Sequence, residues 1–289
     1  MDKPFGSPPP TPLPPHRKAP QGACDAHVHL LAGSEFPLWD GRVENPAEGI
    51  DFDSWIKLYQ EHLENLGCSR GLIVHSILYG SDNSVTISAL KRLGDGFKGV
   101  GLLPDNASDQ QLDDFASANI CAVRLNYVHG GILGWEGAKA MAPRLADRDM
   151  HVQMLLHADQ HIDALATDIR ALPVPLVIDH CGWPSAGLDP DGSGIDTLCA
   201  LLAEGRVWVK LSGLYRLTNA PFEKADRIVA KLAKANPERC LWGSDWPYIM
   251  LNGATQPNGG NALDALDRVI DDNQRQRILV DNPAKLFRF

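Results

Sequence analysis

Eight short apolar segments, each followed by a stretch with helical periodicity, constrain the fold of this 289-residue chain more than any other feature. The segments are almost continuously hydrophobic, which is typical of parallel strands covered on both faces. Parallel strands need crossover helices, so eight such units predict an α/β fold, a single (β/α)8 barrel. The predicted strands are 23–30, 71–76, 99–103, 121–127, 151–157, 176–181, 207–213 and 240–245.

The intervening stretches have the pattern of amphipathic helices. In the first, Trp55, Tyr59, His62 and Leu66 recur at helical spacing, and Gly67 suits the C-terminal cap. A doubly wound open sheet is the alternative fold, but the first strand lacks the Gly-x-Gly-x-x-Gly turn that would follow it there. The predicted helices are 53–66, 85–93, 110–118, 137–148, 161–172, 195–203, 223–235 and 262–269.

The first 21 residues contain eight prolines. Proline has no amide donor and interrupts helices, so residues 1–21 are predicted to form an extended, flexible tail outside the core, and residues 22–289 to form the barrel domain. A proline-rich ligand for a partner protein is the alternative role of this segment, and a plain tail is favoured.

Composition narrows the functional classes. A formal net charge of -9 without a basic block argues against a nucleic-acid partner. No apolar stretch approaches the ~20 residues of a membrane helix, and no signal-type run is present, so we expect a cytoplasmic protein without a membrane partner. The six cysteines lack Cys-x-x-Cys spacing and are expected to be free thiols. Monomer and homo-oligomer both remain open.

The first predicted strand carries Asp25-Ala-His27-Val-His29. Alternate residues of a strand point to the same face, so these three side chains are expected to project into one cavity. Two adjacent imidazoles form either half of a metal site or a pair of proton donors for a developing negative charge. A satisfied core or surface histidine is the simpler alternative for either one.

Polar and titratable side chains stand in or just after seven of the eight predicted strands. In a (β/α)8 barrel the active site lies at the carboxyl ends of the strands, so these groups are predicted to meet there. Arg124 has a structural alternative, an ion pair with Asp25 or Asp179, and a buried Lys210 would need a carboxylate neighbour. The remaining groups of this kind are His75, Ser76, Gln153, His157, His180, Ser212, Tyr215, Arg216 and Asp245.

Four sequence motifs, and the order in which they follow one another, resemble those of the amidohydrolase superfamily. More narrowly, they resemble those of its branch of 2-pyrone-4,6-dicarboxylate lactonases and related sulfomuconolactone and sugar-lactone hydrolases. Residues 281–287 also resemble the ending of that branch. The motifs are Asp25-Ala-His27-Val-His29, Val177-Ile-Asp179-His180-Cys-Gly182, Val209-Lys210-Leu-Ser212-Gly213 and Gly243-Ser-Asp245-Trp-Pro247.

The resemblance implies a reaction centre of His27, His29, His180 and Asp245, with Asp245 activating the hydrolytic water. It also implies that Arg124 and Ser76 bind a substrate carboxylate, and we expect help from Arg42, Tyr215 or Arg216. The dicarboxylate lactonases have a second arginine on strand four and a tyrosine in the first loop. This chain has Gly130-Gly131 in the region of that second arginine, and it has no tyrosine in residues 36–54. Both differences argue against the pyrone dicarboxylate itself as the substrate.

The cofactor has two alternatives. Binuclear members of the superfamily use a lysine or glutamate on strand four and a histidine on strand five. This chain offers Arg124 and Gln153 there, so a binuclear centre is not expected. His27, His29, His180 and Asp245 could bind one Zn²⁺ or Mn²⁺. The pyrone lactonases resembled here work without metal.

The predicted function is hydrolysis of a small anionic lactone, a carboxylic ester bond, in aromatic or sugar-acid catabolism. Lactone isomerisation and metal-dependent decarboxylation are the enzymatic alternatives. A barrel that binds small acids without turnover is the non-enzymatic one.

Overall fold

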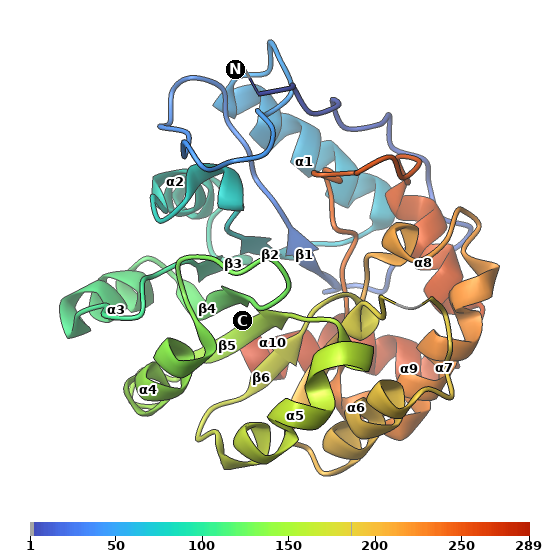
Figure 1. Ribbon diagram of the computed structural model, residues 1–289. Coiled ribbons are helices and arrows are strands. Elements are labelled where there is room, and N and C mark those ends of the chain that lie inside the picture. Colours follow the sequence, from blue (N-terminus) through green and yellow to red (C-terminus); the bar gives the residue numbers. More distant parts are fainter. Residues whose placement is uncertain (1–2, 186) are drawn as a thin grey trace.

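The computed structural model describes residues 3–185 and 187–289 and contains a single eight-stranded parallel sheet in the order β1 to β8. Each strand pairs with the next in sequence, and the (β/α)8 barrel is confirmed (Figure 1). The strands are β1 (Cys24–Val28), β2 (Arg70–Val74), β3 (Phe97–Gly101), β4 (Ile120–Asn126), β5 (His151–Leu155), β6 (Leu176–Ile178), β7 (Val207–Leu211) and β8 (Cys240–Trp242).

The barrel closes between its first and last strands just beyond the end of β8. The amide of Asp245 donates to the carbonyl of His27 at 2.9 Å, and the amide of His29 donates to the carbonyl of Trp246 at 2.8 Å. Val28 and Trp246 form an isolated parallel bridge. These bonds lie between residues of the two predicted catalytic motifs, so closure of the sheet also brings those motifs together.

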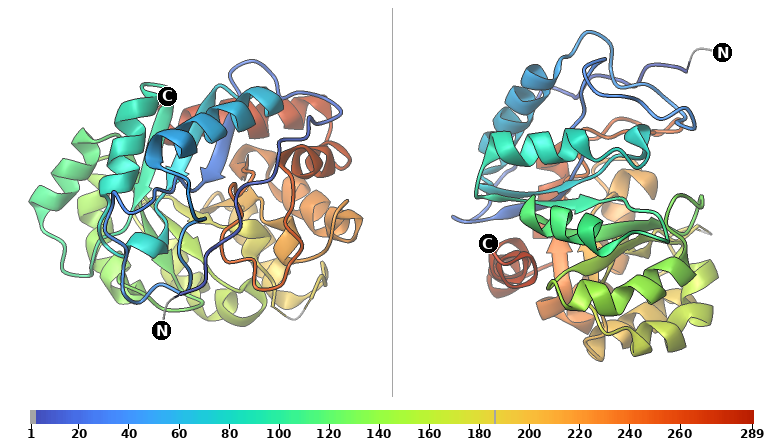
Figure 2. Two further views of the ribbon diagram at one scale, coloured as in Figure 1. Left: turned by 90° about the horizontal axis from the view of Figure 1, so that it is seen from above. Right: turned by 90° about the vertical axis from the view of Figure 1, so that its left-hand side faces the viewer.

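The helices surround the strands, as the two views in Figure 2 show. The eight predicted helices are all present, with end positions that differ by up to three residues. The structure adds two helices and a π-helical turn at the C-terminus that periodicity did not predict. The helices are α1 (Phe52–Leu66), α2 (Ser84–Leu93), α3 (Asp109–Ser117), α4 (Trp135–Ala146), α5 (Ala158–Ala171), α6 (Ser193–Ala203), α7 (Asp226–Ala235), α8 (Gly259–Asp267), α9 (Asp272–Gln276) and α10 (Asn282–Phe287), with the π-helical turn η6 (Arg277–Asp281) between the last two. Among the described residues, no helix is long and apolar enough to cross a membrane.

The barrel interior is filled by an apolar cluster that includes Leu72, Val100, Trp208 and Leu241. Phe287 of α10 belongs to the same cluster and is 1% exposed. In the right-hand view of Figure 2, the C-terminus lies on the opposite side of the strands from the N-terminus. Because apolar side chains fill the interior, we look for a ligand site at the carboxyl ends of the strands, where active sites of (β/α)8 barrels lie.

The proline-rich segment is extended, as predicted, and runs along the barrel. The amide of Leu13 donates to Asn258 Oδ1 at 2.9 Å, the amide of His16 donates to Asp264 Oδ1 at 2.7 Å, and Pro15 is buried. These contacts tie the segment to α8 and the loop before it. Flexibility of residues 1–21 stays a prediction, and residues 1 and 2 of that range lie outside the described residues.

One prediction for the first strand is wrong. Asp25 does not share a cavity with His27, because the β1–β2 register is irregular between Asp25 and Val28. The Asp25 carboxylate instead accepts hydrogen bonds from the amide of Ser244 at 2.8 Å and from its hydroxyl at 2.5 Å. His62 of α1 lies 3.4 Å away. Asp25 therefore fastens β1 to the segment after β8 and to the helical layer.

Candidate active site

Four side chains predicted to form the reaction centre meet at the carboxyl end of the barrel. The Nε2 atoms of His27 and His29 lie 3.5 and 3.6 Å from Asp245 Oδ1. The Nε2 atom of His180, in the short turn η2 (His180–Gly182) after β6, lies 3.8 Å from Asp245 Oδ2. None of the four is more than 2% exposed. Strand ends far apart in sequence therefore place three imidazoles around one carboxylate.

The two carboxylate oxygens of Asp245 have different environments. Oδ2 accepts from the Tyr215 hydroxyl at 2.8 Å and from Arg216 Nε and Nη2 at 3.3 and 3.2 Å. Oδ1 is buried and has no hydrogen-bond partner among the residues that the structure describes. Burial alone would raise the pKa of Asp245, but the nearby positive charge of Arg216 helps to outweigh it, and the pKa is held well below its ordinary value. Asp245 is therefore ionised at neutral pH, with one oxygen available.

Each imidazole is oriented through its Nδ1 atom. His29 Nδ1 lies 2.8 Å from the carbonyl oxygen of Val74, and His180 Nδ1 lies 3.0 Å from the Ser212 hydroxyl. A side chain at Gly213 would come within 2.5 Å of His180 Nδ1, so only glycine leaves room for this ring. Burial lowers the pKa of all three histidines, that of His180 to about 4, and the rings are neutral at pH 7.

The orientation of His29 has a chemical consequence. A carbonyl oxygen only accepts, so Nδ1 of the neutral ring must donate to Val74, and Nε2 must carry the lone pair. That lone pair lies 3.6 Å from the unpartnered Oδ1 of Asp245. Two acceptors this close in a buried site need a hydrogen-bond donor or a cation between them. The geometry therefore suits a water molecule or a metal ion at this point.

The same atoms fit a single divalent ion. His27 Nε2 and Asp245 Oδ1 are both buried, and neither has a hydrogen-bond partner in the described part of the chain. Together with His29 they form a group whose ligand atoms lie within 4.8 Å of one another. Neutral imidazole nitrogens and a carboxylate oxygen are the donors that Zn²⁺ prefers in sites that keep a position open for water.

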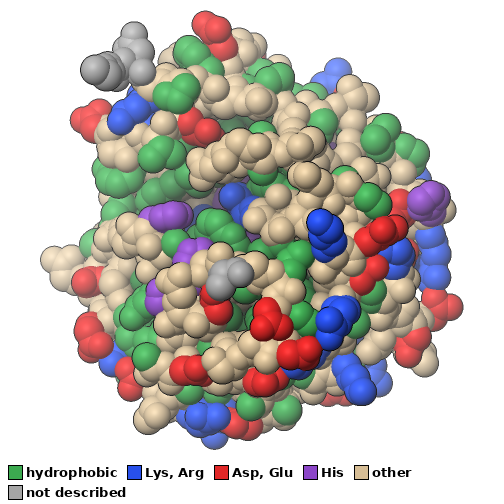
Figure 3. Space-filling model, turned by 45° about the vertical axis from the view of Figure 1, so that its right-hand side comes forward, with side chains coloured by type: hydrophobic (Ala, Val, Ile, Leu, Met, Phe, Trp, Pro, Cys, Tyr) green, Lys and Arg blue, Asp and Glu red, His purple; other side chains and the backbone are tan. Residues whose placement is uncertain are grey.

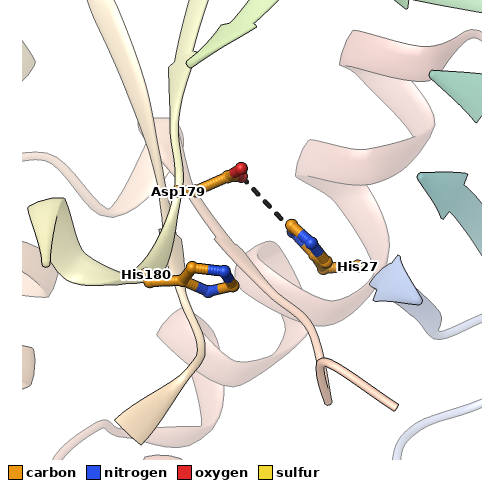
Figure 4. A group of neighbouring side chains, drawn as sticks. All are labelled: His27, Asp179 and His180. Carbon is orange, nitrogen blue, oxygen red and sulfur yellow. Dashed lines mark ion pairs between the residues drawn. The ribbon is translucent and has the colours of Figure 1, made fainter. Parts of the chain in front are cut away.

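A buried polar network lies beneath the reaction centre. Lys210 Nζ donates to Gln153 Oε1 at 2.7 Å, and Gln153 Nε2 donates to Asp179 Oδ2 at 3.1 Å. Asp179 Oδ1 lies 3.3 Å from His27 Nδ1 and 3.6 Å from Lys210 Nζ. Figure 4 marks the pair of Asp179 and His27 with a dashed line. Arg124 Nη2 lies 3.7 Å from Asp179 Oδ2, so of its two predicted carboxylate partners the structure selects Asp179. The network fixes the position of His27 and compensates a buried carboxylate with cations.

Sequence reasoning gave Gln153 no role, and it considered Asp179 and Lys210 only as members of possible ion pairs, which the structure shows. Their shared signal was a charged or amide side chain within an otherwise apolar strand, which is costly unless it is paired. Burial would raise the pKa of Asp179, but its charged neighbours, Lys210 among them, outweigh burial, so the pKa is lowered. Burial lowers the pKa of Lys210 to about 8, so Lys210 remains mostly protonated at neutral pH.

A cavity opens above the reaction centre, and Figure 3 shows histidine side chains gathered around a hollow of the surface. Of the five predicted substrate ligands, Arg124 and Arg216 line this cavity. His75 and His129, which the sequence left without a role, line it as well.

The other three predicted ligands make different contacts. Ser76 accepts a hydrogen bond from the amide of Leu78, and Tyr215 donates to Asp245, beneath the cavity. Arg42 binds Asn45 Oδ1 and the carbonyl of Trp39 in the loop before α1. None of the three is among the residues found to line the cavity, so direct substrate contact by Ser76, Tyr215 and Arg42 stays a prediction without geometric support.

An eight-stranded α/β barrel with His-x-His at its first strand, histidine after the sixth and aspartate after the eighth defines a hydrolase of the amidohydrolase type. The family model named Amidohydrolase matches residues 24–289, and the chain belongs to this family.

Curated relatives cover nearly the whole chain. A 4-sulfomuconolactone hydrolase of Hydrogenophaga intermedia is 32% identical over 279 residues, which are 93% of this chain and 89% of that protein. A 2-pyrone-4,6-dicarboxylate hydrolase of Comamonas testosteroni is 28% identical over 96% of this chain and 93% of its own length. Among solved structures, one named a probable 2-pyrone-4,6-dicarboxylic acid hydrolase from Acinetobacter baumannii, with citric acid bound, has a TM-score of 0.80. It is 21% identical and covers 93% of this chain and all of its own.

Proposed function

We propose that the protein is a hydrolase that opens the ring of a small anionic lactone. The observation that carries the proposal is the single unpartnered oxygen of an ionised, buried Asp245, surrounded by three neutral imidazoles and lying beside a cavity lined by Arg124. Both curated relatives named above are lactone hydrolases, which supports the same reaction class.

The reaction begins with water between Asp245 Oδ1 and His29 Nε2, both of which accept its hydrogens. Asp245 takes a proton as the water oxygen attacks the ring carbonyl, and a tetrahedral oxyanion forms. His27 and His180 can present N–H groups to that oxyanion, because Lys210 Nζ and the Ser212 hydroxyl can each donate to their Nδ1 atoms. The bond between the carbonyl carbon and the ring oxygen then breaks, and Asp245 returns its proton to the ring oxygen.

We propose the same four residues, His27, His29, His180 and Asp245, as ligands should a divalent ion bind. A bound ion would supply Lewis acidity to the carbonyl and lower the pKa of its water. Elemental analysis of purified protein decides between the two forms. If the protein holds one zinc or manganese per chain and loses it together with activity on chelation, the ion polarises the lactone carbonyl. Full activity in metal-free protein assigns it to the imidazoles.

Turnover of a panel of pyrone, muconolactone and aldonolactone acids in ¹⁸O-water tests the reaction. Hydrolysis incorporates one ¹⁸O atom into the product carboxylate. Ring migration without ¹⁸O would make the protein a lactone isomerase, loss of CO₂ would make it a decarboxylase, and tight binding without any product would make it a binding protein. Each of these three outcomes contradicts the proposal.

Arg124→Met is expected to raise KM for the anionic lactone by roughly 10- to 100-fold, with a smaller effect on kcat. Arg124 is the guanidinium with an unpartnered Nε in the cavity wall, so its loss removes binding rather than proton transfer. Steady-state kinetics of the variant and the wild-type protein measure the changes in KM and kcat separately. A variant whose kcat falls while KM stays constant would place Arg124 in the chemical step instead.

A further inference from the structure

The cations around the cavity lie beside carboxylates. Lys210 Nζ and Arg124 Nη2 lie 3.6 and 3.7 Å from Asp179, and Arg216 Nη2 lies 3.2 Å from Asp245. An anion buried without a partner is costly, so a substrate can bring into the site only as many anionic groups as there are cations with a hydrogen-bond donor left to offer that positive charge.

Arg216 cannot supply that charge to a substrate. Its Nε and Nη2 bind Asp245 Oδ2, and Nη1 and Nη2 lie 3.5 and 3.3 Å from the carbonyls of Met250 and Ile249. Glu44 adds a negative charge nearby, since its carboxylate accepts from the amide of Met250 at 2.7 Å.

Arg124 is therefore the guanidinium with unused donor capacity. Nη1 donates to the carbonyl of His75 at 3.3 Å, and Nε has no hydrogen-bond partner within residues 3–185 and 187–289. Among the residues that the structure describes, Arg124 and Arg216 are the lysines and arginines found to line the cavity.

Much of the rest of the cavity wall is apolar, and Asn126, His129 and Asn252 line it beside the apolar side chains. Leu102 follows β3, Leu155 ends β5, and Ile132 and Leu133 lie in the loop between β4 and α4. Gly131 of the same loop also lines the cavity and carries no side chain that could bind an anion. A substrate group that reaches this wall gains by being uncharged and apolar.

We infer that the substrate is a lactone with one anionic group, held at Arg124, and an uncharged, apolar substituent that packs against Leu102, Ile132, Leu133 and Leu155. The inference rests on the proposed lactone hydrolysis and narrows it to monoanionic lactones. It separates the expected substrate of this chain from the dicarboxylate named for one of its relatives.

The test compares a 2-pyrone-6-carboxylate bearing a 4-methyl group with the matching 2-pyrone-4,6-dicarboxylate. For the wild-type protein we expect kcat/KM to favour the monoanionic methyl compound by ~10²-fold, because the second carboxylate has no cation to meet. Equal rates, or a preference for the dicarboxylate, overturn the inference and leave lactone hydrolysis standing. Absence of turnover with every lactone overturns the proposed function, and the inference with it.

Gly131→Arg supplies a second guanidinium in the apolar part of the wall. A Cβ atom at Gly131 meets nothing within 4 Å, and its backbone is outside the left-handed region that neighbouring Gly130 occupies at φ 68°. We expect the dicarboxylate-to-monocarboxylate ratio of kcat/KM to rise at least ~10-fold. Gly131→Gln, of similar size and without charge, is the control and should leave the ratio near its wild-type value. A ratio that rises equally in both variants, or in neither, contradicts the charge argument.

Discussion

Replacing Asp245 by asparagine is expected to lower kcat by roughly 10³-fold or more while the barrel stays folded, since general-base catalysis contributes ~10²–10⁴ on its own. Asparagine keeps an oxygen that can accept from Tyr215 and Arg216, but it cannot take a proton from water. Single-turnover kinetics measure the loss of rate, and a thermal unfolding curve shows whether the barrel stays folded.

Tyr215→Phe provides the graded comparison. This variant removes one hydrogen bond to Asp245 Oδ2 and leaves Oδ1 untouched, so we expect a loss of only ~10-fold. Wild-type rates in Asp245→Asn would remove the proposed base. A Tyr215→Phe variant as inactive as Asp245→Asn would show that orientation of the carboxylate, rather than its basicity, limits the rate.

The second large effect concerns the buried network. Asp179→Asn is expected to lower the free energy of unfolding by about 3–5 kcal/mol, because Lys210 and Arg124 would remain buried without their counter-charge. Urea denaturation at pH 7 measures the loss. Glu204→Gln, which breaks the exposed pair with Arg170 at 2.7 Å, is the matched surface control and should cost much less.

A double variant isolates the electrostatic part of the stability that Asp179→Asn loses. Lys210→Met removes one of the two cations that Asp179→Asn leaves unpaired, so the double variant should recover part of the lost stability. If Asp179→Asn and Lys210→Met were simply additive, the lost packing or hydrogen bonds would explain the effect, and the charge argument would fail.

The sequence predicted the barrel because each buried parallel strand is a nearly continuous hydrophobic run, which can be recognised without knowing its neighbours. Because strand ends of a barrel share one rim, it predicted that polar side chains would meet there, and the family resemblance singled out His27, His29, His180 and Asp245 among them. It misplaced Asp25, since strand alternation fails at an irregular register that only the paired strand reveals.

Loops and termini were harder to predict. Arg42 was selected as the only basic residue of its loop, but the course of that loop depends on contacts that composition does not reveal. The C-terminal helices α9 and α10 were missed because they are short and their contact with the barrel is made through few residues, chiefly Phe287. Asp179 and Lys210 were visible as buried charges, but their pairing required the three-dimensional register of β6 and β7.

The seam between β1 and β8 makes enzymatic activity a sensitive reporter of local opening. Asp245, the proposed general base, is joined to the first strand by a backbone hydrogen bond to His27, and β8 itself is only three residues long. If β1 and the segment after β8 separated, the three imidazoles would move away from the Asp245 carboxylate while most helices stayed intact. On gentle heating, the rate should therefore decay before the far-ultraviolet circular dichroism signal does, and reclosure on cooling should restore it.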